Sequence, residues 1–87
     1  MITSAEIKKR LTDQPFSPFR IITSSGRHYD ILHPEFLMVG KRILGVGTVA
    51  EEGDLEVDGV DVISILHVTA LEMVNPKSKK KKSNSTH

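Results

Sequence analysis

The first residues of the chain alternate apolar and polar side chains with the period of a helix. Thr3 and Glu6 stand where a capping box requires them: the Thr3 hydroxyl can accept from the Glu6 N–H, and the Glu6 carboxylate from the Thr3 N–H. Ile7 and Leu11 then share one helix face at a spacing of four. Pro15 disfavours helix at the residue before it. The pattern predicts a short N-terminal helix that packs through Ile7 and Leu11.

After Pro18 the apolar residues change to the alternation of β-strands. The runs 19–23 and 27–32 predict a hairpin, in which Gly26 can supply a positive φ. Further strand-like runs lie at 36–39, 43–50, 60–64 and 68–74. Residues 65–67 lack clean alternation and predict a single 3₁₀ turn. We expect these side chains to be mostly buried: Ile7, Leu11, Phe19, Ile21, Ile31, Phe36, Ile43, Val62, Val68 and Leu71.

Two glycines interrupt the run at 43–50. Gly45 and Gly47 indicate a bulge or a bend, and a small sheet bent in this way tends to curl into a barrel. The predicted fold class is α+β: an N-terminal helix followed by about five short antiparallel strands, curled into a small Sm-like or SH3-like barrel. Residues 1–76 form the single predicted domain, and residues 77–87 a disordered basic tail, because a lysine-rich segment cannot bury apolar surface.

The layout over residues 3–75, with a 3₁₀ turn before the last strand, resembles the Sm-like fold. The bacterial Sm-like RNA chaperone has a Tyr-Lys-His-type signature, of which only His67 has a counterpart here, so no RNA-contacting residue is carried over. The chain more closely resembles a group of small uncharacterised bacterial proteins. That resemblance rests on Pro-Phe-Ser-Pro-Phe at 15–19, Gly-Arg at 26–27 and His-Pro-Glu-Phe at 33–36. It implies a fold and no particular activity.

The net charge of +1 conceals two oppositely charged parts. The tail has five lysines and no acid, whereas residues 1–76 hold the other seven basic residues and all eleven acids, a net charge of −4. Flexible lysines attract phosphates without reading sequence. The candidate nucleic-acid contacts are therefore Lys77, Lys79, Lys80, Lys81 and Lys82.

Catalytic and metal chemistry find little support in the composition. The absence of cysteine excludes disulfides, thiolate zinc sites and a cysteine nucleophile. Residues 54–59 resemble half of a calcium loop, but its twelfth position is Ile65 rather than a glutamate, and a solvated acidic hairpin is the simpler interpretation. His28 and His33 differ by an odd number and are expected on opposite faces. We expect no enzyme activity, no cofactor and no metal.

The function predicted from these observations is a non-catalytic binding module. The run 68–74 ends the sheet with Glu72 as its only charge, and an uncharged edge invites pairing with another chain. We expect self-association or another protein partner through that edge. The alternative is an Sm-like nucleic-acid-binding protein assisted by the lysine tail. No membrane partner and no small-molecule substrate are expected. A cytoplasmic location is expected, because no apolar run nears the roughly 20 residues of a membrane span and the N-terminal residues lack a signal-peptide pattern.

Removal of residues 77–87 separates the two functions. If the chain binds nucleic acid, the truncation weakens binding and lowers the slope of log affinity against log salt by roughly 3.5 to 4.5, since about five phosphate contacts are lost. Fluorescence anisotropy with a short labelled RNA and a short duplex DNA at two salt concentrations measures this change. Absence of binding by the full chain at low salt would rule out the nucleic-acid function.

Overall fold

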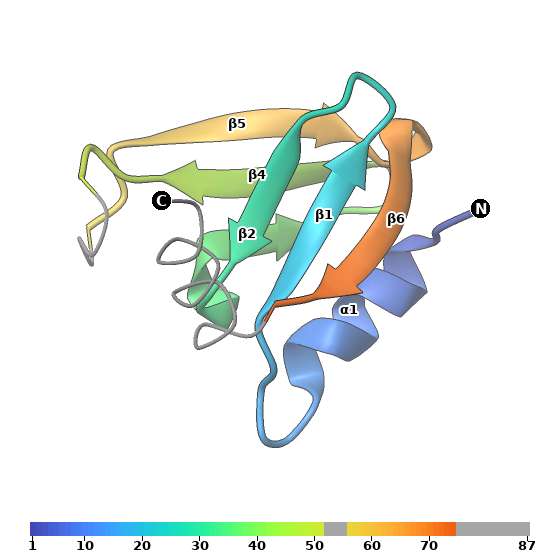
Figure 1. Cartoon of the computed structure of the whole chain (residues 1–87), viewed down its shortest axis with the longest axis horizontal. Helices are drawn as coiled ribbons and strands as arrows, with labels where there is room; N and C mark the ends of the chain where they lie inside the picture. The colour runs from blue at the N-terminus through green and yellow to red at the C-terminus, as the bar shows by residue number, and fades with distance from the viewer. Residues whose placement is uncertain (52–55, 75–87) are drawn as a thin grey trace, which may run out of the picture.

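The computed structural model describes residues 1–51 and 56–74, and its elements follow the predicted order along the chain (Figure 1). The elements are α1 (Ser4–Thr12), β1 (Phe19–Thr23), β2 (His28–Ile31), the 3₁₀ turn η1 (Pro34–Phe36), β3 (Leu37–Val39), β4 (Ile43–Thr48), β5 (Gly59–Ser64), the 3₁₀ turn η2 (Ile65–His67) and β6 (Val68–Met73).

The predicted capping box starts α1. Thr3 Oγ1 accepts from the Glu6 N–H at 3.2 Å, and Glu6 Oε1 accepts from the Thr3 N–H at 3.2 Å. Each bond satisfies a backbone donor that the first helical turn leaves unpaired. Ile7 is completely buried, so α1 docks on the sheets through the face that its spacing predicted.

The predicted turns are also confirmed. Gly26 has a φ of +89° in the hairpin between β1 and β2, a region that side-chain-bearing residues rarely adopt. The 3₁₀ turn η2 covers 65–67 as predicted, and Ser64 Oγ caps it by accepting from the Leu66 N–H at 3.3 Å.

The prediction that the strands curl into a small barrel is wrong. The described strands number six and form two separate three-stranded antiparallel sheets, in the orders β2-β1-β6 and β3-β4-β5. Figure 1 shows β2, β1 and β6 running steeply across the direction of β4 and β5. The turn η1 leads from β2 to β3 and the turn η2 from β5 to β6, and no described strand of one sheet pairs with a strand of the other, as closure into a barrel would require. The fold is a small α+β arrangement of one helix and two sheets.

The glycines of β4 do not bend it in the way the barrel required. Gly45 pairs with Val62 and Gly47 with Val60 within a β4–β5 ladder that runs unbroken from Ile43 to Thr48. The register shift in the β1–β6 pair lies elsewhere, between Ile22 and Thr23. Gly45 and Gly47 therefore occupy regular strand positions.

The core lies between the two sheets, and half of the expected core residues are buried. The buried ones are Ile7, Phe19, Ile21, Ile31 and Val68, while Leu11, Phe36 and Leu71 are half-buried. Ile43 and Val62 were wrong, with exposed fractions of 53% and 67%. Their neighbours Leu44 and Ile63 are buried instead, because successive side chains of a strand point to opposite faces.

The outer face of the β2-β1-β6 sheet is held by charge. Arg20 on β1 pairs across the sheet with Asp30 on β2 and Glu72 on β6. Its Nε lies 2.7 Å from Asp30 Oδ1, and its Nη1 lies 3.9 Å from Glu72 Oε1. The hydrogen bond and the charge of Asp30 raise the pKa of Arg20 above its ordinary value. This row is a polar surface suited to water.

Truncation of two isoleucines tests the packing. Ile7→Ala should lower the free energy of unfolding by about 2–4 kcal/mol, because it leaves a cavity between helix and sheets. The same change at the half-exposed Ile43 should cost less than about 1 kcal/mol. Denaturant titration measures both, and a loss under about 0.5 kcal/mol for Ile7→Ala would show that α1 is not docked through this residue.

Candidate functional site

The outer face of the β3-β4-β5 sheet carries a group of exposed apolar side chains. They are between 46% and 67% exposed and come from all three strands and the segment that precedes β5: Met38, Ile43, Val57, Val60 and Val62. We call this group the outer apolar face. The buried side chains of the same strands, such as Leu44 and Val46, point to the opposite side and fill the core.

Two glycines make the outer apolar face continuous. Met38, Gly45 and Val62 stand in one row across the sheet. A Cβ placed on Gly45 would lie 3.3 Å from Met38 Cε and 3.4 Å from Val60 Cγ1, so both side chains lie over the glycine. A Cβ on Gly47 would lie 3.0 Å from Val57 Cγ2. The glycines thus let apolar groups from β3, β5 and the segment before β5 close over β4.

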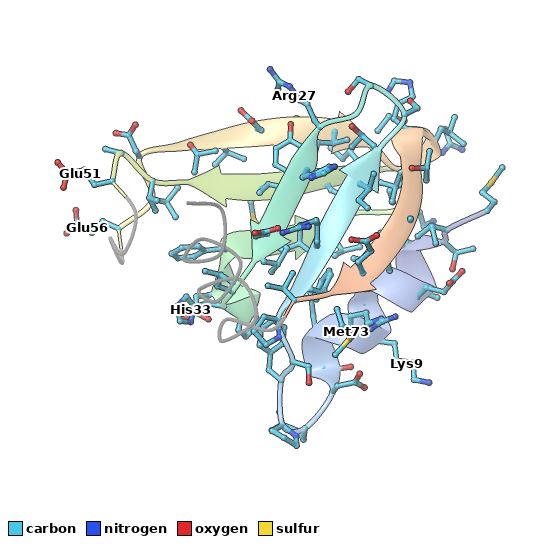
Figure 2. All side chains as sticks on the ribbon, in the orientation of Figure 1. Lys9, Arg27, His33, Glu51, Glu56 and Met73 are labelled. Atoms are coloured by element: carbon cyan, nitrogen blue, oxygen red, sulfur yellow. The ribbon has the colours of Figure 1, made fainter. Side chains whose placement is uncertain are left out.

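Charged residues of opposite sign mark the two ends of the β4–β5 ribbon. Lys41 and Arg42 precede β4 and are exposed. Glu51, Glu56 and Asp58 lie beyond the other end of the ribbon and are exposed as well. Figure 2 shows Glu51 and Glu56 together at that far end. The outer apolar face therefore lies between a basic end and an acidic end.

A cavity of about 300 Å³ opens between β2, η1 and β4. His28 and His33 both line it, together with Phe36, whose ring meets the His33 ring edge-on at 5.7 Å between centroids. The prediction that these two histidines face opposite sides is wrong, because His33 lies beyond the end of β2, where the chain turns into η1. The lining is mainly apolar.

A second cavity, of about 270 Å³, lies between the β1–β2 hairpin and β5 and contains His67. Arg27 donates to the Tyr29 hydroxyl at 3.2 Å there. The hydrogen bond and the electrostatic interaction with Tyr29, followed by the charge of Asp61, raise the pKa of Arg27 above its ordinary value. Within residues 1–51 and 56–74, no group of three or more His, Asp or Glu side chains is placed to hold a metal ion.

Several candidates from the sequence fall outside the described residues. These are Asp54 of the calcium-loop resemblance and the tail lysines Lys77, Lys79, Lys80, Lys81 and Lys82. The other basic residues come from separate elements: Lys8, Lys9 and Arg10 from α1, Arg20 from β1, Arg27 from the hairpin, and Lys41 and Arg42 from the turn before β4.

Comparison with known proteins adds no assignment: no family model, no curated protein and no solved structure matches this chain. The resemblance to small bacterial proteins stays a prediction, and the barrel that the Sm-like layout implied is wrong. In the part of the chain that the structure describes, no helix is both long and apolar enough to cross a membrane.

Sequence reasoning missed the outer apolar face, although a signal for it was present. Ile43, Leu44 and Val46 place apolar residues at both parities of β4, and Val62 and Ile63 do so in β5. Strands that are apolar at both parities are typical of sheets covered on both faces. One face of these strands is covered by the core, and the apolar side chains on the other are exposed in the part of the chain that the structure describes.

Alanine at the two glycines tests how the outer apolar face is built. Gly45→Ala should change the free energy of unfolding by less than about 1 kcal/mol, because the flexible Met38 side chain can yield and alanine favours a strand over glycine. Gly47→Ala should be less stable than Gly45→Ala, because Val57 Cγ2 lies only 3.0 Å from the position of the new Cβ and must move. Denaturant titration gives the order, and the reverse order would contradict the placement of Val57.

Proposed function

We propose that this protein is a non-catalytic binding module that binds another protein chain through the outer apolar face. The observation that carries the proposal is the row Met38–Gly45–Val62, apolar and open to solvent across a three-stranded sheet. The equivalent row on the other sheet is Asp30–Arg20–Glu72, which is charged. The outer face of the β2-β1-β6 sheet is therefore charged along this row, whereas that of the β3-β4-β5 sheet is apolar.

The size of the surface supports an interface. The largest apolar patch on a monomer covers roughly 300–600 Å² and often has a function. Five aliphatic side chains that are each about half to two-thirds exposed belong in that range. The surface also ends at a strand edge, because β5 is the last strand of its sheet. Backbone groups of an edge strand can extend the contact with a partner.

The edge of β6 stays a predicted second surface. β6 ends the order β2-β1-β6, as expected for the last strand. α1 approaches one end of this strand, where Arg10 Nη1 lies 3.0 Å from Met73 Sδ. The edge also carries Thr69 and Glu72, so it offers less continuous apolar surface than the outer apolar face.

The alternative function, nucleic-acid binding, is supported by the five tail lysines. Residues 1–76 carry a net charge of −4, which favours a protein partner over a phosphate backbone. The positive charge of Arg20, which a phosphate could otherwise contact, is already paired with Asp30 and Glu72.

Two matched double variants test the proposed function. Met38→Gln with Val62→Gln places two amides on the outer apolar face. Met73→Gln with Leu66→Gln makes the same change at two residues off that face, which are 61% and 75% exposed. Each variant, and the unchanged chain, serves as tagged bait in extract from cells that naturally produce the protein, after mild cross-linking. Quantitative mass spectrometry compares the captured proteins.

We expect the face variant to lose at least about tenfold of a specific partner, because central apolar contacts carry most of the binding energy of an interface. The off-face variant should retain it. Denaturant titration confirms that both variants are folded. Equal capture by the two folded variants would contradict the proposed function.

A further inference from the structure

We propose that the partner of the outer apolar face is a second copy of this chain, packed face to face with its β4–β5 ribbon antiparallel to the first. This inference rests on the proposed function and names its partner. Three properties of the described residues support it: the symmetry of the surface, the charges at its ends and the area that two copies would bury.

A two-fold dimer requires a surface that matches itself after a half-turn. A two-fold axis that runs parallel to the surface of the sheet and perpendicular to β4 turns one copy over onto the other. The apolar centre of one copy then lies on the apolar centre of the second. Met38 and Val60, which both lie over Gly45, then face the same group of the second copy. The centre of the surface meets the condition for an isologous interface.

The charged ends select the antiparallel arrangement. A strand of six residues spans roughly 20 Å, which exceeds the ~8–10 Å over which salt leaves charges unscreened, so each end senses only what lies directly opposite. In the antiparallel dimer, Lys41 and Arg42 of each copy face Glu56 and Asp58 of the other. In a parallel dimer like charges would face each other at both ends, and the two copies would repel.

The buried area is in the range of a weak, reversible pair. Two patches of roughly 300–600 Å² each bury about 600–1,200 Å² when they meet, before the charged ends are included. A biological interface is expected to clear about 1,000 Å². The upper part of the range reaches this size, and the charged ends add to the area that a second copy would bury.

Sedimentation equilibrium of the full chain measures the pairing and its salt dependence. We expect a monomer–dimer equilibrium at micromolar concentrations, weakened roughly tenfold when salt is raised from about 0.05 to about 0.5 M, because attraction between the ends is screened. The Met38→Gln, Val62→Gln variant should weaken the dimer at least about tenfold, and the Met73→Gln, Leu66→Gln variant should not. A monomer at high-micromolar concentration would overturn the inference, and so would a dimer that salt strengthens.

Engineered cysteines then determine the arrangement, because the chain has none of its own. Lys41→Cys and Asp58→Cys variants are mixed in equal amounts, one with a mass tag, and treated with a short bis-maleimide. The antiparallel dimer predicts the mixed 41–58 product, at least about tenfold above the like-with-like products. A Lys9→Cys variant on α1 is the control and should give no dimer-specific product (Figure 2). Predominant 41–41 and 58–58 products would overturn the inference.

The two proposals fail separately. If the bait experiment captures a foreign protein through the outer apolar face and the chain itself stays monomeric, the binding module stands and the second copy does not. If the face variant and the off-face variant capture the same proteins in equal amounts, and the chain stays monomeric, both proposals fail.

Discussion

Burial of Leu44, Val46 and Ile63 between the two sheets is the constraint on which the rest of the structure depends. A strand alternates its side chains between two faces. Once these residues enter the core, the positions that alternate with them along each strand must point outward. That set includes Gly45, Gly47, Val60 and Val62. The composition of the outer apolar face therefore follows directly from the packing of the core on the other side of the same two strands.

The outer faces of the two sheets differ in polarity. On the β2-β1-β6 sheet, Arg20 joins carboxylates from both neighbouring strands. On the β3-β4-β5 sheet the equivalent row is apolar, and each Å² left in water forgoes about 25 cal/mol of favourable burial. Association recovers part of this after the loss of rotational and translational freedom is subtracted. The outer apolar face is therefore the surface from which association with a partner gains free energy of apolar burial.

Charge adds direction to that surface. The ends of the β4–β5 ribbon carry opposite signs, with Lys41 and Arg42 before β4 and Glu56 and Asp58 before β5. Exposed pairs of this kind contribute little stability individually, but they discriminate between partners and between orientations. The β4–β5 ribbon thus has a basic end and an acidic end, although the overall charge of the protein is close to neutral.

Local rules in the sequence determined the helix start at Thr3, the turn at Gly26, the 3₁₀ turn at 65–67 and the ranges of most strands, because capping, φ preference and alternation act between near neighbours. The tertiary structure alone decided which parity of β4 and β5 faces inward, since both parities are apolar and propensity cannot choose between Ile43 and Leu44 or between Val62 and Ile63. It also decided that the six described strands form two sheets rather than a barrel, because strand pairing joins residues far apart in the chain, whereas the glycines had suggested one bent sheet. The outer apolar face is the product of those two decisions, which depend on contacts between residues far apart in the chain.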